Sequence, residues 1–252
     1  MRLSIAAQNK TSLISRLPKK LPSSNYHGDL PLENILYSNN SFYMIDAVSI
    51  EYDSYVFDIA KLNKEYNEAK PYRHVVIDNF FVDSFARNIF NDMPGYEENN
   101  DAKYDNPIEK KRTIQNWTKF SKNIYKAATY LVNQEFTGYL QQLTQQKDLM
   151  PDFGLHGGGI HMHKTGDYLN THLDYNIHPK LDMKRKLNLI VYLNPNWQES
   201  WGGNLGLWSH DEETDQPKEL IKSVPPVFNR AVIFDTTQNS WHGVTEGIFA
   251  PE

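Results

Sequence analysis

The sequence predicts an α+β protein built on a double-stranded β-helix (jelly roll) with supporting helices, preceded by a smaller N-terminal unit. Residues 120–149 carry apolar side chains at helical spacing. Short apolar runs then alternate with Gly, Pro, Asn and Asp, which is the pattern of short strands joined by turns. Many short strands after a helical segment are typical of two packed sheets with helices on one side. The expected strands of this part are residues 155–163, 187–193, 204–208, 220–223 and 231–234.

The first part of the chain has a different pattern. Residues 34–37 and 42–45 are short apolar runs, and the polar residues 38–41 between them predict a hairpin turn. Residues 55–66 predict a helix, and Pro71 follows its polar end. We therefore expect two domains, residues 1–70 and residues 71–252.

The second domain is expected to open with a strand at residues 74–78 and a helix at residues 83–91, with Asp83 as its N-cap. Residues 99–111 are polar and predict a loop.

Composition narrows the classes of protein. The chain has 252 residues, a formal charge of -5, 13% aromatic residues and no cysteine. The absence of cysteine excludes disulfides, thiolate metal sites and cysteine nucleophiles, and it suits a cytoplasmic protein. The mild negative charge argues against a nucleic-acid partner, and no apolar run is long enough for a membrane span. Nothing in the sequence indicates the oligomeric state.

Three residues form a candidate metal site. His172 and Asp174 are two residues apart, so on a strand both would face the same side. His242 follows Asp174 by 68 residues, on a later predicted strand. Two imidazoles and one carboxylate can occupy one face of an iron(II) ion and leave positions open for oxygen and an organic co-substrate.

The surroundings of these residues resemble the prolyl 4-hydroxylase-like branch of the iron(II)/2-oxoglutarate-dependent oxygenases. Four segments carry the resemblance in the same order as in that family: residues 71–81, 163–174, 189–205 and 230–244. The resemblance implies a dioxygenase that uses Fe(II), O2 and 2-oxoglutarate, with ascorbate as an auxiliary reductant, to hydroxylate its substrate. The carboxylate of Asp174 favours hydroxylation over halogenation. Two alternatives stay open: a cupin-like metalloenzyme that does not use 2-oxoglutarate, and a non-catalytic, truncated fusion remnant.

The residue that would bind the distal carboxylate of 2-oxoglutarate is not found where the family has it. The family uses an Arg or Lys about ten residues after the distal histidine, and residues 243–252 contain neither. We therefore expect the chain to be truncated at its C-terminus, with Lys186 or Arg230 as the alternative cations. Tyr192 and Tyr168 are candidate co-substrate-binding residues.

The N-terminal domain resembles the catalytic loop of aminoglycoside phosphotransferases and choline-kinase-like enzymes. Asp29 and Asn34 have the five-residue spacing of a kinase base and metal ligand, and Asp46 follows a hairpin as the second magnesium ligand does. Only 26 residues precede His27, so a nucleotide-binding lobe does not fit before it. We expect this kinase-like fragment to be a vestige of a C-lobe without phosphotransferase activity.

Overall fold

The computed structural model describes residues 2–7, 35–38, 41–44, 58–98 and 100–250. They fall into two compact units. The larger unit comprises Met1–Asn9 and Phe57–Glu252, and the smaller unit comprises Lys10–Val56.

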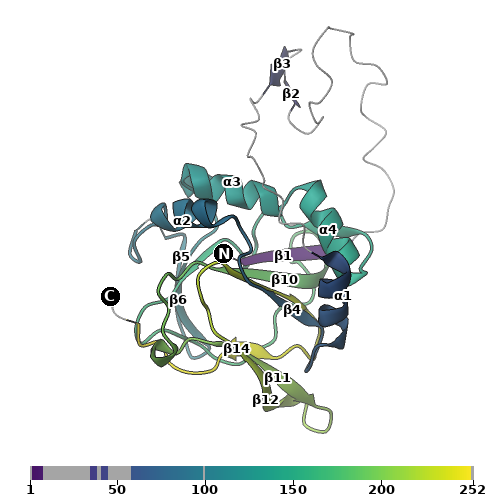
Figure 1. Ribbon diagram of the computed structural model, residues 1–252, viewed down its shortest axis with the longest axis vertical. Helices are drawn as coiled ribbons and strands as arrows, with labels where there is room; N and C mark the ends of the chain where they lie inside the picture. Colours follow the sequence, from purple (N-terminus) through teal and green to yellow (C-terminus); the bar gives the residue numbers. More distant parts are fainter. Residues whose placement is uncertain (1, 8–34, 39–40, 45–57, 99, 251–252) are drawn as a thin grey trace. The chain divides into compact units, whose positions relative to one another are not determined.

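The larger unit is organised around a five-stranded antiparallel sheet (Figure 1). Its central strand is β10 (Lys184–Tyr192), which pairs with β13 (Arg230–Asp235) on one side and with β1 (Arg2–Ala7) on the other. The outer strands are β4 (His74–Ile77) and β7 (Leu149–Pro151). The first strand of the chain is therefore an interior strand of the main sheet, which the sequence did not indicate.

Two smaller sheets complete the strand arrangement. One has the order β12 (Gln216–Val224), β11 (Leu205–Asp211) and β14 (His242–Val244). The other joins β5 (Ala102–Asp105), β6 (Glu109–Ile114) and β8 (Ile160–Met162), and β9 (Tyr168–Leu169) also pairs with β6. The antiparallel sheets facing each other fit a jelly roll.

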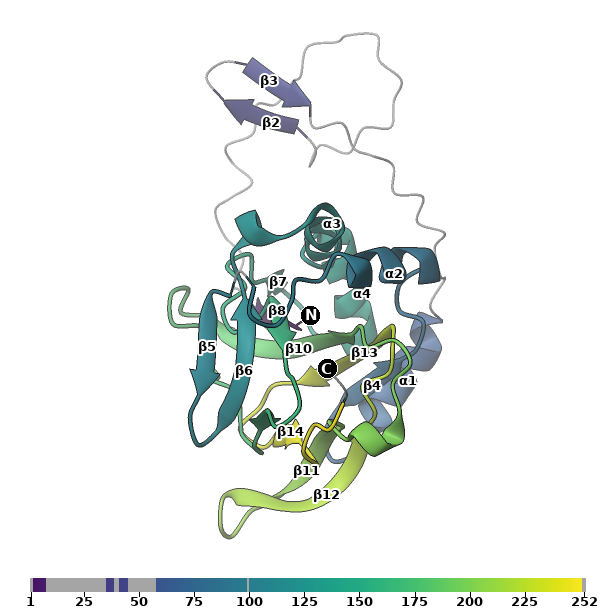
Figure 2. The same ribbon diagram turned by 90° about the vertical axis from the view of Figure 1, so that its left-hand side faces the viewer.

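Four α-helices cover the side of the main sheet that faces away from β11 and β12 (Figures 1 and 2). They are α1 (Ile59–Glu68), α2 (Asp83–Asn91), α3 (Lys122–Leu131) and α4 (Gln134–Thr144). Leu187, Leu189 and Val191 of β10 belong to the apolar core that these helices share. Ile190 and Tyr192, on the opposite face of β10, pack instead with Leu205 and Leu207 of the second sheet. Burial thus alternates along β10 between a helix layer and a barrel interior.

Helix α1 belongs to the larger unit rather than to the smaller one. Asp58 caps the helix by accepting a hydrogen bond from the amide of Lys61. Tyr66 is fully buried, and its hydroxyl donates to the carboxylate of Asp235 on β13. Arg73 pairs with the same carboxylate at 2.6 Å. The compact unit consequently begins before the boundary at residue 70 that the sequence suggested, because the buried face of α1 packs on this sheet.

Several local predictions hold and others were wrong. The strands expected at 74–78, 187–193, 204–208, 220–223 and 231–234 are confirmed as β4 and β10–β13. Residues 99–111 are not a loop, because Ala102–Asp105 and Glu109–Ile114 form a hairpin whose strands carry polar residues on both faces. Asp83 is in the first turn of α2 and Val82 takes the N-cap position. The helical stretch predicted at 120–149 forms two helices, because Asn133 is the N-cap of a second helix, α4.

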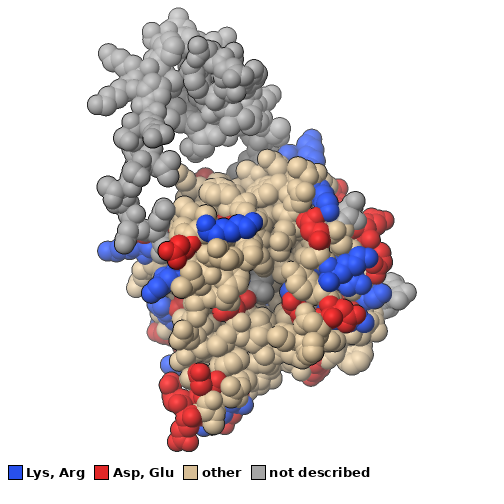
Figure 3. Space-filling model, turned by 180° about the vertical axis from the view of Figure 1, so that it is seen from behind, with Lys and Arg blue, Asp and Glu red and all other residues tan. Residues whose placement is uncertain are grey.

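Ion pairs hold the edge formed by β5 and β6. Glu97 lies within 4 Å of three basic groups, those of Lys103, Arg112 and Lys164. Figure 3 shows acidic and basic side chains side by side on this part of the surface. These exposed pairs each contribute little, but together they fix the hairpin against the chain that leads from β8 to β9.

The smaller unit contains a hairpin of β2 (Ile35–Ser38) and β3 (Ser41–Met44). This hairpin confirms the turn predicted at residues 38–41. Asp29, Asn34 and Asp46, the residues of the kinase-like motif, lie outside the described residues. Across the part of the chain that the model describes, every helix is too short or too polar to pass through a bilayer.

Candidate metal centre and its cavity

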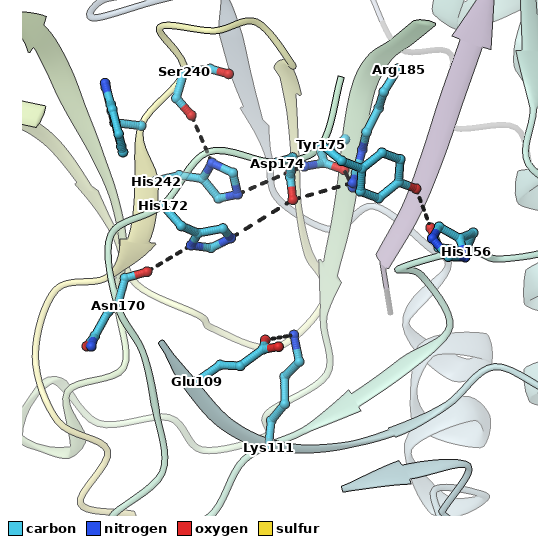
Figure 4. A network of polar contacts seen from close by, with 12 residues as sticks. Glu109, Lys111, His156, Asn170, His172, Asp174, Tyr175, Arg185, Ser240 and His242 are labelled. Carbon is cyan, nitrogen blue, oxygen red and sulfur yellow. Dashed lines mark hydrogen bonds and ion pairs between the residues drawn. The ribbon is translucent and has the colours of Figure 1, made fainter. Parts of the chain in front are cut away.

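His172, Asp174 and His242 come together as predicted. One ligand atom from each lies within 4.8 Å of the other two, and no other group of three or more His, Cys, Asp or Glu side chains among the described residues is spaced to hold a metal. Nε2 of His242 is 3.3 Å from Asp174 Oδ2, and Nε2 of His172 is 3.9 Å from Asp174 Oδ1. Figure 4 shows both imidazole rings turned toward the carboxylate.

The backbone brings the two histidines together by a single bridge. The amide of His172 donates to the carbonyl of His242 at 2.9 Å, and the amide of His242 donates back at 3.1 Å. The sequence predicted that residues 172–174 lie on a strand. In the structure they are not part of a regular strand. The two-residue spacing still places His172 and Asp174 at one site.

Gly243 allows this close approach. A Cβ at this position would lie 2.9 Å from the carbonyl carbon and oxygen of Asn170 and from Cα of Thr171. Any side chain there would push the segment carrying His172 away from β14. The glycine after the distal histidine is thus required by packing.

Hydrogen bonds fix the tautomer of both imidazoles. Nδ1 of His172 lies 2.8 Å from the carbonyl oxygen of Asn170, and Nδ1 of His242 lies 2.9 Å from that of Ser240. A carbonyl only accepts, so each Nδ1 carries a proton, and each Nε2 is the ring nitrogen that faces Asp174 and can bind a metal. The donor set is therefore two imidazole nitrogens and one carboxylate oxygen. This set fits an iron(II) ion with open positions.

The carboxylate of Asp174 is held by two residues of β10. The side-chain amide of Asn188 donates to Oδ2, and the guanidinium of Arg185 lies 3.4 Å from Oδ1. Arg185 also donates to the amide oxygen of Asn188 and stacks over the ring of Tyr175. The side chain of Arg185 is only 2% exposed. These contacts leave Asp174 little freedom to rotate.

Residues 185 and 188 reach the same carboxylate because β10 has a bulge. In the register with β1, Ala6 faces Arg185 while Ile5 faces Leu187, so Lys186 is an extra residue. A bulge resets the alternation of faces and allows side chains three positions apart to converge. Sequence reasoning missed both residues, although an Asn inside the apolar run 187–193 was a signal that a polar partner lay within the core.

Tyr72 adds a half-buried phenol beside the site. Its hydroxyl donates to the carbonyl of Trp241 at 3.0 Å. Burial and the negative charge of Asp174 raise the pKa of this phenol far above its ordinary value. Tyr72 is therefore protonated at every physiological pH.

A cavity of about 380 Å³ reaches the metal centre, because His242 is part of its lining. None of the described residues that line it is Lys, Arg, Asp or Glu. Besides His242, the polar side chains are those of His161, His163, Tyr192 and Asn194, and the remaining lining is apolar or aromatic. Trp197 and Trp201 stand perpendicular to each other in this lining, with ring centroids 5.6 Å apart.

The two tyrosines expected at the co-substrate differ in position. Tyr192 lines the cavity and lies on the interior face of β10. Tyr168 is outside the lining, and its hydroxyl donates to the carbonyl of Asn106 at 2.8 Å. Of the two alternative cations, Arg230 makes two hydrogen bonds with the carboxylate of Asp78. Lys186 is the bulged residue of β10 and is absent from the cavity lining.

His163 lines the cavity in a largely uncharged state. Burial, together with the nearby charge of Lys111, lowers the pKa of His163 to about 4. Lys111 itself is buried and pairs with Glu109 at 2.5 Å. Figure 4 shows this ion pair in the same view as the metal triad.

Comparison with known proteins agrees with this geometry. Residues 158–248 match the family model described as the 2OG-Fe(II) oxygenase superfamily. Over 62 residues the chain is 40% identical to Prolyl 3-hydroxylase OGFOD1 of Mus musculus and 39% identical to the same protein of Xenopus laevis. These matches cover 25% of this chain but only 11% and 12% of those relatives.

The fold is similar to that of a solved prolyl-4-hydroxylase from Pseudomonas putida. The TM-score is 0.55 at 14% identity, and the match covers 76% of this chain and 92% of that one. At this identity the likeness concerns the fold alone. The family match at 158–248 contains all three residues of the candidate metal site, and the structural likeness concerns the fold that surrounds them.

Proposed function

We propose that this chain is an iron(II)- and 2-oxoglutarate-dependent dioxygenase that hydroxylates a prolyl residue of a peptide or protein. The observation that carries the proposal is the convergence of His172, Asp174 and His242 inside the segment that matches the oxygenase family. Iron, when bound, would supply the activation of O2, with 2-oxoglutarate as the source of two electrons.

The protein contributes geometry to this chemistry. The carbonyls of Asn170 and Ser240 keep a proton on Nδ1 of each histidine, so Nε2 is the nitrogen left to bind a metal. Arg185 and Asn188 hold the carboxylate of Asp174 in place. Three ligands on one side of an ion leave the other side for O2 and the keto acid.

The cavity supports a neutral, largely apolar substrate group. Its described lining contains no charged side chain, and it includes Trp197, Trp201 and Met93. A prolyl ring is apolar and has no backbone N–H to satisfy, so it can enter such a lining without leaving a buried donor unpaired. The relatives named as prolyl 3-hydroxylases support the same substrate class.

The test is peptide-dependent turnover. The protein loaded with iron is incubated with 2-oxoglutarate, O2 and proline-containing peptides, with and without ascorbate, and succinate and peptide mass are measured. We expect succinate to form in proportion to peptide hydroxylation, and amino-acid analysis of the product then separates 3-hydroxyproline from 4-hydroxyproline. Succinate formation that no peptide stimulates would contradict the proposed substrate class.

Metal-ligand variants provide the specificity control. His172→Ala, Asp174→Ala and His242→Ala should each lose iron binding and turnover. His178→Ala removes a buried histidine that contacts Asp152 rather than the triad, and should keep both. Iron stoichiometry that is unchanged in all three ligand variants would reject the site.

A further inference from the structure

We propose that Lys111 binds the distal carboxylate of 2-oxoglutarate by exchanging it for its present partner, the carboxylate of Glu109. The inference rests on the proposed function, which requires a dianionic co-substrate at the metal. A carboxylate that leaves water for a largely apolar cavity needs a charge-assisted hydrogen bond, and an ammonium group provides one. Lys111 and Glu109 form an ion pair on strand β6, with Nζ 2.5 Å from the carboxylate.

The pairing of β6 places this ion pair on the strand face that turns toward the cavity. Thr113 is opposite His161 of β8. Glu109 is opposite Leu169 of β9. Residues directly opposite each other in an antiparallel pair share a face of the sheet, and both His161 and Leu169 line the cavity. Lys111 lies two residues from Glu109 and from Thr113, so its side chain leaves β6 on the same face.

The ammonium group of Lys111 is close to the cavity wall. Its charge contributes to the lowered pKa of His163, which is a lining residue. Figure 4 shows the side chains of Lys111 and Glu109 extending from β6 in the direction of the metal triad. In this paired arrangement neither of the two side chains lines the cavity. The flexible stem of a lysine allows the ammonium to turn from Glu109 toward a carboxylate in the cavity.

The ion pair adds little to stability and leaves its lysine available for exchange. The side chain of Lys111 is 7% exposed and that of Glu109 is 19% exposed. At such burial the desolvation of two charges offsets much of the attraction between them. A ligand carboxylate can therefore replace Glu109, which is near enough to solvent to turn outward. Because the two carboxylates compete for one ammonium, removal of Lys111 and removal of the charge on Glu109 should have opposite effects on the affinity for 2-oxoglutarate.

Calorimetry with Mn(II)-loaded protein tests the exchange without turnover. The variants are Lys111→Gln, Glu109→Gln and the double variant that combines them. The matched control is Lys103→Gln, which removes an exposed lysine charge from the outer face of the same hairpin, opposite Arg112. Each protein is titrated with 2-oxoglutarate and with 2-oxobutyrate, which has the same keto-acid end and no distal carboxylate.

We expect Lys111→Gln to bind 2-oxoglutarate about tenfold to a hundredfold more weakly than the wild type, and 2-oxobutyrate equally well. Glu109→Gln should bind 2-oxoglutarate at least as tightly as the wild type, and Lys103→Gln should bind both ligands normally. Unchanged 2-oxoglutarate binding in Lys111→Gln, or an equal loss for both ligands, would overturn the assignment. Weaker 2-oxoglutarate binding in Glu109→Gln would overturn it too, because the pair would then act as a structural unit.

The double variant covers the case in which Lys111→Gln does not fold because Glu109 is left buried without its partner. It removes both charges, and it should show the same selective loss for 2-oxoglutarate. Retained 2-oxobutyrate binding shows that the variant is folded, and wild-type affinity of the double variant for 2-oxoglutarate would reject the role of Lys111. If the Mn(II)-loaded wild type binds no 2-oxoglutarate at all, the proposed function fails instead.

Discussion

Replacement of Asn188 by leucine should weaken metal binding without touching a metal ligand. Leucine branches at Cγ as asparagine does, but it removes the donor to Asp174 Oδ2 and the acceptor for Arg185. The carboxylate then loses one of the two contacts that orient it. Loss of a supporting hydrogen bond behind a metal ligand costs about ten- to a hundredfold in metal affinity.

The stability of the metal-free protein should fall as well. Hydrogen bonds to charged groups contribute about 1.5–3 kcal/mol each, and Asn188 makes two, one to a carboxylate and one to a guanidinium. The leucine recovers part of this through apolar contact in a fully buried position. We therefore expect a loss of about 2–4 kcal/mol in the free energy of unfolding.

Two measurements separate these effects. Mn(II) affinity is measured by calorimetry, and the free energy of unfolding is measured by urea denaturation without metal. Asn229→Ala is the matched control, because this buried amide bonds to the backbone of Phe81 and should lower stability while leaving Mn(II) affinity unchanged. A folded Asn188→Leu protein with the metal affinity of the wild type would refute the idea that this amide positions Asp174.

Three further predictions concern the packing and titration of the same region. Gly243→Ala should weaken Mn(II) binding and lower the melting temperature, because the new methyl group meets the backbone of Asn170 at 2.9 Å; a normal metal affinity in calorimetry would contradict this. Tyr66→Phe should lower the free energy of unfolding by about 1.5–3 kcal/mol in urea, since it removes a buried hydrogen bond to Asp235; no change would show that Arg73 and Gln146 satisfy the carboxylate without it. The lowered pKa of His163 means that the unfolded chain takes up a proton first, so stability should fall as the pH drops from about 6.5 toward 4, by up to about 3 kcal/mol. In His163→Gln this part of the acid-side loss should disappear from the pH dependence of urea denaturation, and an identical profile would reject the assignment.

The convergence of His172, Asp174 and His242 could be predicted from the sequence because the signals for it are local. The two-residue spacing of His172 and Asp174 and the glycine after His242 are visible in single short segments. The strands β10 to β13 were visible for the same reason, since each is an apolar run between turn residues.

Contacts between distant segments could not be predicted from the sequence in this way. The convergence of Arg185 and Asn188 depends on a bulge at Lys186, and a bulge is defined by the partner strand rather than by its own residues. That partner, β1, is more than 170 residues away in the chain. The hairpin at β5 and β6 was missed because its strands have no apolar face, so their pairing is decided by β8 and β9.

The paired backbone hydrogen bonds between His172 and His242 have a consequence for how metal and folding are linked. They hold two ligands from segments 70 residues apart in position through the main chain, independently of any ion. Metal binding then needs little ordering of the chain, so most of its free energy should appear as added resistance to unfolding. Because the bridge forms only when β14 has docked, metal uptake should also report the closure of the barrel, and a stopped-flow signal from bound metal would time that step of folding.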